Sequence, residues 1–203
     1  MIVLTEGRDE RLLHRLEAFS DVVIGFSLAQ LGLSLVIPAR IAMLWHRPTP
    51  FIGFLITFQL ICVFWYMHNR LFAHYFVPTR LNLILNFFAL GSVILLVYSV
   101  QLYIHFPHER TAVAFYAASL SLAFGFIAIL FSIGLRERRV FLDAKELLWG
   151  RKRVARLGCI SAALVIFVLV ASFLSDPASE VVLTAFVAAG AVVSRIIVSR
   201  MKA

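Results

Sequence analysis

The sequence predicts an all-α membrane protein with six transmembrane helices per subunit. Of its 203 residues, 62% are hydrophobic and the mean hydropathy is +0.93, whereas soluble domains are about 45–50% apolar. Only 15% of the residues are charged. The apolar runs approach the roughly 20 residues that a helix needs to cross a bilayer core. Connections between the runs are short, so residues 1–203 are expected to form a single six-span domain.

The first three spans are apolar runs that begin after basic or proline-rich segments. The first runs from about residue 16, beyond a charged arm, to Pro38. The second covers about 51–67 and ends before the polar His68. The third covers about 81–104, directly after Arg80.

The last three spans are bounded by charges in the same way. The fourth covers about 111–135 between two arginines, and the fifth covers about 157–174 after a strongly basic loop. The sixth runs from Glu180, which is expected at the interface, to about 199. Each run is read as a span because it is long, apolar and interrupted by few charges.

The distribution of Lys and Arg predicts the orientation of the chain. Sixteen of the 19 basic residues fall at the two termini and in the second-to-third and fourth-to-fifth loops, which lie on one side of six spans. Cytoplasmic loops carry such an excess, so both termini are expected in the cytoplasm and the protein in the cell membrane. This topology explains the net charge of +8 without a nucleic-acid partner. The basic loop is expected to contact anionic lipid headgroups.

The cytoplasmic start of the first span holds three charges, Arg15, Glu17 and Asp21. A charge at the centre of a span costs about 2.5–3.5 kcal/mol unless it is paired or hydrated. Arg15 and Asp21 lie about 240° apart around a helix, so they cannot pair within one straight helix. Asp21 therefore predicts a polar network between helices. Alternatively, Arg15 and Glu17 only mark the interface by reaching toward water.

Further along the same span, Ser27, Gln30 and Ser34 form a polar stripe. Phe26, Gln30 and Leu33 follow i, i+4, i+7 spacing and share a helix face. This face is interpreted as lining a pore. Small side chains that let helices approach closely, with Gln30 bonding across an interface, would produce the same pattern.

Two motifs resemble those of the transmembrane protein 175 family of bacterial and endolysosomal potassium channels. Arg15-x-x-x-Phe19-Ser20-Asp21 is similar to the family's R-x-x-x-F-S-D signature. The segment from Phe64 to Phe72, which contains Trp65 and His68, and the later Asn86 are similar to its F-W-x-x-H-x-R-L-F segment and following asparagine. The chain has no T-V-G-Y-G segment of the usual potassium filter.

The resemblance implies a homotetramer of six-span subunits with span one around a central pore. It places apolar constrictions at Phe26, Gln30 and Leu33, where Gln30 departs from the family's apolar pattern. Potassium ions are the expected permeant partner, with selectivity and gating from partial dehydration at these rings. Asp21 is expected in a packing network behind the pore in preference to a charged ring at its mouth.

The same resemblance assigns supporting roles to further residues. Arg15, Phe19, Ser20 and Asp21 form the signature network. Trp65, His68 and Asn86 support it, with His68 in a hydrogen-bonded packing role or, alternatively, as a site of pH modulation.

Other classes of function fit less well. The sequence has none of the common nucleotide-binding, hydrolase or metalloprotease motifs, so neither catalysis nor a cofactor is expected. His105 and His108 with Glu109 are interpreted as an interfacial loop, not as a metal site. A secondary transporter is an alternative, although repeated halves with broken helices are not evident. A non-conducting membrane scaffold is the other alternative.

Overall fold

Six long apolar stretches of the chain fold into α-helices. The computed structural model describes residues 6–35, 37–38, 40–41 and 48–201, without the side chains of 6–9, 49 and 177. Over these residues the chain is all-α, with no strand. The helices are α1 Glu6–Leu33, α3 Thr49–His74, α4 Arg80–His105, α5 Arg110–Glu137, α6 Ala144–Ala171 and α7 Asp176–Ser199. Each of the six is long and apolar enough to cross a membrane.

Local signals fix several helix starts. The Thr79 hydroxyl accepts from the Asn82 backbone N–H at 3.2 Å and so caps α4. The Asp143 carboxylate accepts from the Glu146 backbone N–H at 2.7 Å and caps α6. Helices α3 and α7 carry proline in their first turn, where its missing N–H costs nothing.

Three helices differ from the spans expected from the sequence. Helix α6 begins at Ala144, well before residue 157, because the basic segment there is also helical once Asp143 caps it. Helix α3 continues to His74, beyond residue 67, since the polar residues after Met67 remain helical and His68 is buried. Helix α1 ends at Leu33, short of Pro38, where Leu35 N–H donates to the Gly32 carbonyl in a tighter last turn.

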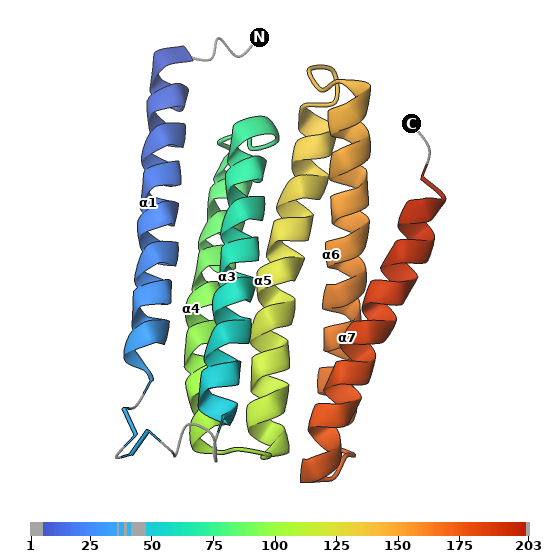
Figure 1. The fold of residues 1–203 in the computed structure, drawn as a ribbon. Coiled ribbons are helices and arrows are strands. Elements are labelled where there is room, and N and C mark those ends of the chain that lie inside the picture. Colours follow the sequence, from blue (N-terminus) through green and yellow to red (C-terminus); the bar gives the residue numbers. More distant parts are fainter. Residues whose placement is uncertain (1–5, 36, 39, 42–47, 202–203) are drawn as a thin grey trace.

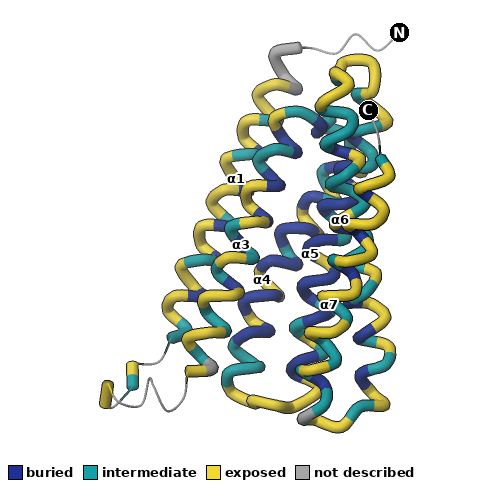
Figure 2. Tube along the Cα trace, turned by 45° about the vertical axis from the view of Figure 1, so that its right-hand side comes forward, coloured by how far each residue is buried: buried dark blue, intermediate teal, exposed yellow. Residues whose placement is uncertain are grey.

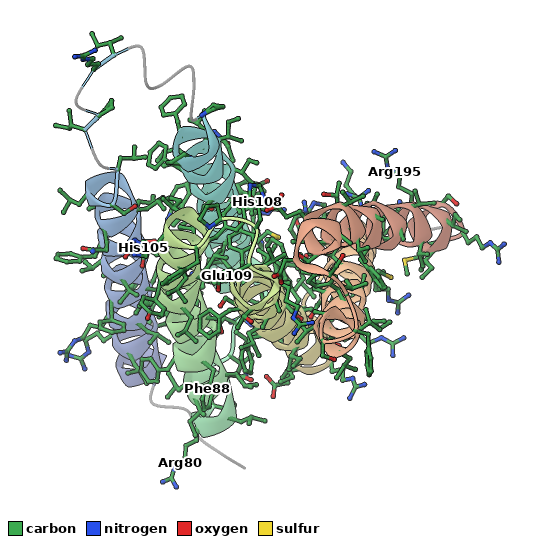
Figure 3. All side chains as sticks on the ribbon, turned by 90° about the horizontal axis from the view of Figure 1, so that it is seen from below. Arg80, Phe88, His105, His108, Glu109 and Arg195 are labelled. Atoms are coloured by element: carbon green, nitrogen blue, oxygen red, sulfur yellow. The ribbon has the colours of Figure 1, made fainter. Side chains whose placement is uncertain are left out.

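The helices stand side by side with both described ends of the chain at the same end of the bundle (Figure 1). Seen end-on, α1 lies on one side and α7 on the other, with α3, α4 and α5 between them (Figure 3). Helix α1 packs against α3 and α4, while α5 packs against α4 and α6. The helix that carries the signature residues is therefore a peripheral helix of the bundle.

The buried side chains gather on α4 and α5, whereas α1 is exposed along its outer edge (Figure 2). Helices α5 and α6 are also joined by reciprocal bonds, in which the Ser121 and Ser161 hydroxyls each donate to the other's carbonyl at 3.0 and 2.9 Å. Small residues and interhelical hydroxyl bonds of this kind allow close helix packing in a bilayer.

At Gly134, α5 comes especially close to the end of α3. A Cβ built there would collide with the backbone carbonyl oxygen of Tyr75, which follows α3. Gly158 on α6 offers the opposite case, because a Cβ there meets no atom within 4 Å. The close contact between α5 and the end of α3 therefore depends on glycine.

We expect Gly134→Ala to destabilise the folded subunit by about 1–3 kcal/mol, because backbone must move to admit the methyl group. Thermal unfolding in mild detergent, followed by tryptophan fluorescence, measures the loss. Gly158→Ala is the control and should unfold at the wild-type temperature or above it. Equal melting temperatures for the two variants would contradict this account of the contact.

Candidate functional site

A buried chain of hydrogen bonds joins α1, α4 and α3. The Asn86 amide of α4 donates to the Ser20 hydroxyl of α1 at 3.3 Å, and its carbonyl oxygen lies 2.8 Å from His68 Nε2 of α3. Because that oxygen can only accept, His68 Nε2 carries the proton. The Ser20 hydroxyl donates in turn to the Leu16 carbonyl at 2.8 Å. Every link has one donor and one acceptor, so the chain is fully satisfied.

The His68 ring is held in place by aromatic neighbours on its own helix. It stacks on Phe72, with ring centroids 4.6 Å apart, and on Phe64 at 6.0 Å. These rings share one face because they are four residues apart. The F-W-x-x-H-x-R-L-F spacing therefore places the imidazole between two phenyl rings and aims it at Asn86.

A second link between α1 and α3 lies closer to the surface. The indole Nε1–H of Trp65 donates to the Asp21 carboxylate at 2.9 Å. On the α4 side, Phe19 meets Phe87 edge to face, with centroids 6.0 Å apart. The signature residues Phe19, Ser20 and Asp21 thus fasten α1 to two different helices.

The other charges of the signature region do not join this network. Arg15 is exposed and makes no hydrogen bond or ion pair with the side chains that the structure describes. Glu17 lies 3.8 Å from His14 one turn earlier on the same helix. Asp21 is therefore met by the Trp65 indole, not by an arginine.

The three residues expected to line a pore share an outward face of α1. Phe26 is 75% exposed and Leu33 is 81% exposed, and Gln30 between them is exposed as well. The buried face of the helix carries the residues Leu16, Ser20, Ile24, Ser27 and Leu31. By helix geometry Asp21 points roughly 140° away from Phe26. The outward face and the hydrogen-bonded face are thus separate.

The polar stripe of α1 is split between these faces, which corrects the grouping expected from the sequence. Ser27 is buried against the bundle and its hydroxyl donates to the Val23 carbonyl at 2.8 Å. The Ser34 hydroxyl donates to the Leu31 carbonyl at 2.6 Å. Both serines satisfy themselves within the helix, so Gln30 alone of the three presents an unbonded polar group outward.

A groove of about 420 Å³ runs between α1 and α4 beside this face. Phe26 and Gln30 line it from α1, and Tyr98 and Gln101 line it from α4. Sequence reasoning missed Gln101, although a carboxamide at membrane depth is the same signal that drew attention to Gln30. The groove leaves room for another helix or for lipid beside α1.

A second cluster was also missed, at the end of the bundle near the described termini. The Arg70 guanidinium lies 3.3 Å from the Glu146 carboxylate and 4.9 Å from the centre of the Trp149 ring, and Arg153 lies at 4.8 Å from that ring. The Tyr75 hydroxyl lies 2.9 Å from Glu146. Burial and the Glu146 carboxylate raise the pKa of the Tyr75 hydroxyl well above its usual value. These contacts fix α6 to the end of α3.

The histidines between α4 and α5 lie near the opposite end of the bundle. His108 Nδ1 lies 3.0 Å from the Glu180 carboxylate, which also accepts from the Tyr103 hydroxyl at 2.9 Å. His105 stacks edge to face with Phe106, and Glu109 precedes α5 (Figure 3). Among the described residues no group of three or more His, Cys, Asp or Glu side chains could hold a metal ion.

This geometry is that of a membrane protein in which one face of α1 is hydrogen-bonded to α3 and α4 while its opposite face is exposed. A family model described as the endosomal/lysosomal potassium channel TMEM175 matches residues 15–96, which hold α3, most of α1 and much of α4. The resemblance indicated by the sequence motifs is therefore confirmed. No curated protein matches the sequence.

Two solved structures are similar to the chain in fold. One is a variant of the potassium channel MtTMEM175 in complex with a nanobody–MBP fusion protein, with TM-score 0.71 and 19% identity over 92% of this chain and 94% of that one. The other is a lysosomal potassium-selective channel TMEM175 homolog from Chamaesiphon minutus, with TM-score 0.67 and 19% identity over 91% of this chain and 98% of that one. These relatives are described as channels, not as enzymes.

We expect Asn86→Leu to lower the free energy of unfolding by about 1–3 kcal/mol, because the buried His68 Nε2–H loses its acceptor and the Ser20 hydroxyl loses the donor from α4. Thermal unfolding in detergent measures this. Ser92→Ala is the matched control on α4, since the Ser92 hydroxyl donates only to the Phe88 carbonyl of its own helix, at 2.7 Å. A double-mutant cycle of His68→Ala with Asn86→Leu should be non-additive by at least about 0.5 kcal/mol. Additive losses would show that the two side chains do not interact.

Proposed function

We propose that this protein is a subunit of a potassium-permeable cation channel, a homotetramer whose ion path is lined by the outward face of α1. Phe26, Gln30 and Leu33 form its constrictions. The bundle spans the cell membrane with both termini in the cytoplasm. In support of the channel function, the matching family and both similar structures are described as potassium channels.

The observation that carries the proposal is the uncovered carboxamide of Gln30 on an otherwise apolar outward face. A polar group in contact with lipid tails costs several kcal/mol if it has no partner. Phe26 and Leu33 on either side of it are also largely exposed in the single subunit. A face of this kind is suited to a narrow water-containing path, because Gln30 then finds water or ions to bond.

Small residues beside this face support assembly around it. Gly25, Ala29 and Gly32 lie on the adjoining exposed side of α1. A Cβ at Gly25 or Gly32 would meet no atom of the same chain within 4 Å, so nothing inside the subunit requires glycine there. Small residues at such spacing let two helices approach closely in a bilayer. A second α1 is the occupant that places Phe26 and Gln30 around a common axis.

The proposed mechanism follows from the chemistry of these side chains. Phe26 and Leu33, separated by about 10 Å along the helix, offer an ion no ligand. An ion passes only with partial loss of its hydration shell, which costs less for potassium than for the smaller, more strongly hydrated sodium. The Gln30 carbonyl oxygen offers partial compensation between the two apolar rings. Narrow apolar rings also close the path when they lose water.

The network of α1 with α3 and α4 has the role of a support in this mechanism. Ser20 and Asp21 bond to neighbouring helices, and Asp21 points away from Phe26. Rotation or tilt of α1 would have to strain these bonds. We infer that Asn86, His68 and Trp65 set the position of the constriction without touching the ion.

In planar bilayers with potassium on one side and sodium on the other, we expect a reversal potential displaced toward the potassium equilibrium potential. Gln30→Leu should displace the reversal potential further in the same direction, because the Gln30 oxygen no longer compensates for dehydration of the ion. It should also lower the conductance about tenfold, because a carboxamide contact worth about 1–2 kcal/mol to the ion is lost. Gln59→Leu is the matched control, since Gln59 is exposed on α3, away from the α1 face. Absence of current in wild-type bilayers, or equal effects of the two variants, would contradict the proposal.

We expect native mass spectrometry in mild detergent to show four subunits for the wild-type protein. Gly25→Leu should raise the subunit dissociation constant by at least about tenfold, because the larger side chain separates neighbouring α1 helices. Gly158→Leu, at an equally open glycine on α6, should leave the tetramer intact. A wild-type monomer would contradict a central pore lined by α1.

A further inference from the structure

A basic groove of about 740 Å³ lies between α5, α6 and α7, far from α1. It opens at the end of the bundle that carries both described chain ends, where α5 finishes, α6 begins and α7 finishes (Figure 1). Four arginines line it, namely Arg136, Arg139, Arg151 and Arg200. Arg136 lies on α5, Arg139 in the loop after it, Arg151 on α6, and Arg200 directly after α7. The fold, not one charged segment, therefore brings them together.

These four positive charges are not balanced by the described part of the chain. None of the four side chains forms an ion pair with a described acidic side chain. The acids that end α5 and begin α6 are already engaged: Glu146 pairs with Arg70, Asp143 caps α6, and Glu137 accepts from the Asn82 amide at 3.2 Å. Guanidinium groups bind phosphate oxygens in a bidentate manner, so the groove fits a phosphate-bearing anion.

The rest of the groove lining is mostly apolar. Besides the arginines, it consists of Ser132, Leu135, Leu148, Val154, Ala155 and Met201. The apolar stretches of α5, α6 and α7 begin or end at this level, since Leu135 precedes Arg136, Leu157 follows Arg156, and Val198 precedes Arg200 by two residues. The groove therefore spans the boundary between the hydrocarbon core and the headgroup layer.

The loop that follows α5 adds a further apolar contact at this level. Val140 and Phe141 come directly after Arg139 and are 91% and 86% exposed. Large apolar side chains left bare beside clustered arginines are typical of a segment that lies in a membrane interface. The loop thus combines an arginine that lines the groove with two exposed apolar side chains.

We propose that this groove is a binding site for one anionic phospholipid per subunit. Its phosphate lies among Arg136, Arg139, Arg151 and Arg200, and an acyl chain lies against Leu135 and Ala155. A second copy of the chain is a poor occupant, because its groove would bring the same four positive charges. Free inorganic phosphate would leave the apolar part of the lining uncovered. The site is remote from α1, and its occupancy does not depend on ion conduction.

The test is a titration of the purified, delipidated protein in mild detergent with fluorescent phosphatidylglycerol or phosphatidylcholine. Wild type should bind phosphatidylglycerol at least about tenfold more tightly, because both lipids carry the phosphodiester but the choline cation of phosphatidylcholine is repelled by the four arginines. Arg139→Gln with Arg200→Gln should abolish this preference. Arg156→Gln with Arg195→Gln, which removes two charges outside the groove, should retain it; Arg195 projects away from the bundle (Figure 3).

Two measurements on the wild-type protein keep the proposal testable if a variant folds poorly. Native mass spectrometry should retain one phosphatidylglycerol per subunit, and that lipid should raise the melting temperature more than phosphatidylcholine does. Equal binding of the two lipids, or equal losses in both double variants, would overturn the site. Inorganic phosphate binding as tightly as phosphatidylglycerol would overturn the lipid assignment.

Discussion

The buried hydrogen-bond chain from Ser20 through Asn86 to His68 is the constraint on which the arrangement of α1 depends. Helix α1 is peripheral and its main packing partners are α3 and α4. Few contacts other than these hydrogen bonds therefore fix its rotation about its own axis. In a bilayer, apolar packing gives little preference for one rotation over another, because lipid tails are as apolar as the helices. Polar bonds with fixed direction supply that preference.

Because the hydrogen-bond chain fixes the rotation of α1, it also determines which side chains lie on the opposite face of that helix. The buried stripe from Leu16 to Leu31 faces the bundle, and Phe26, Gln30 and Leu33 are left uncovered. The polar signature residues can therefore determine which side chains are exposed on the outward face of α1, although they do not lie on that face. This explains how a proposed ion path can be lined by few polar groups while its geometry rests on several.

The two ends of the bundle are organised by different chemistry. Near the described termini, Arg70, Glu146 and Trp149 fix α6 to α3, and the unbalanced arginines lie beyond them on α5 to α7. At the opposite end, Glu180 on α7 joins the Tyr103 hydroxyl and His108. The chain thus combines the helix that we propose lines an ion path with a group of helices that we propose contacts lipid headgroups.

The sequence by itself determined the all-α class, the six apolar helices and the resemblance carried by two motifs, because length, hydropathy and residue spacing are local properties. It also indicated that Asp21 needs a partner on another helix, which proved to be Trp65. Only the tertiary structure decided that Ser27 is buried while Gln30 is bare, that Gln101 lies beside Gln30, and that α6 begins at Ala144. It alone gathered four arginines, from α5, the loop after it, α6 and the residue that follows α7, into one groove. Which face of a helix is covered, and which distant charges become neighbours, depends on contacts between segments far apart in the chain, and no local pattern encodes those contacts.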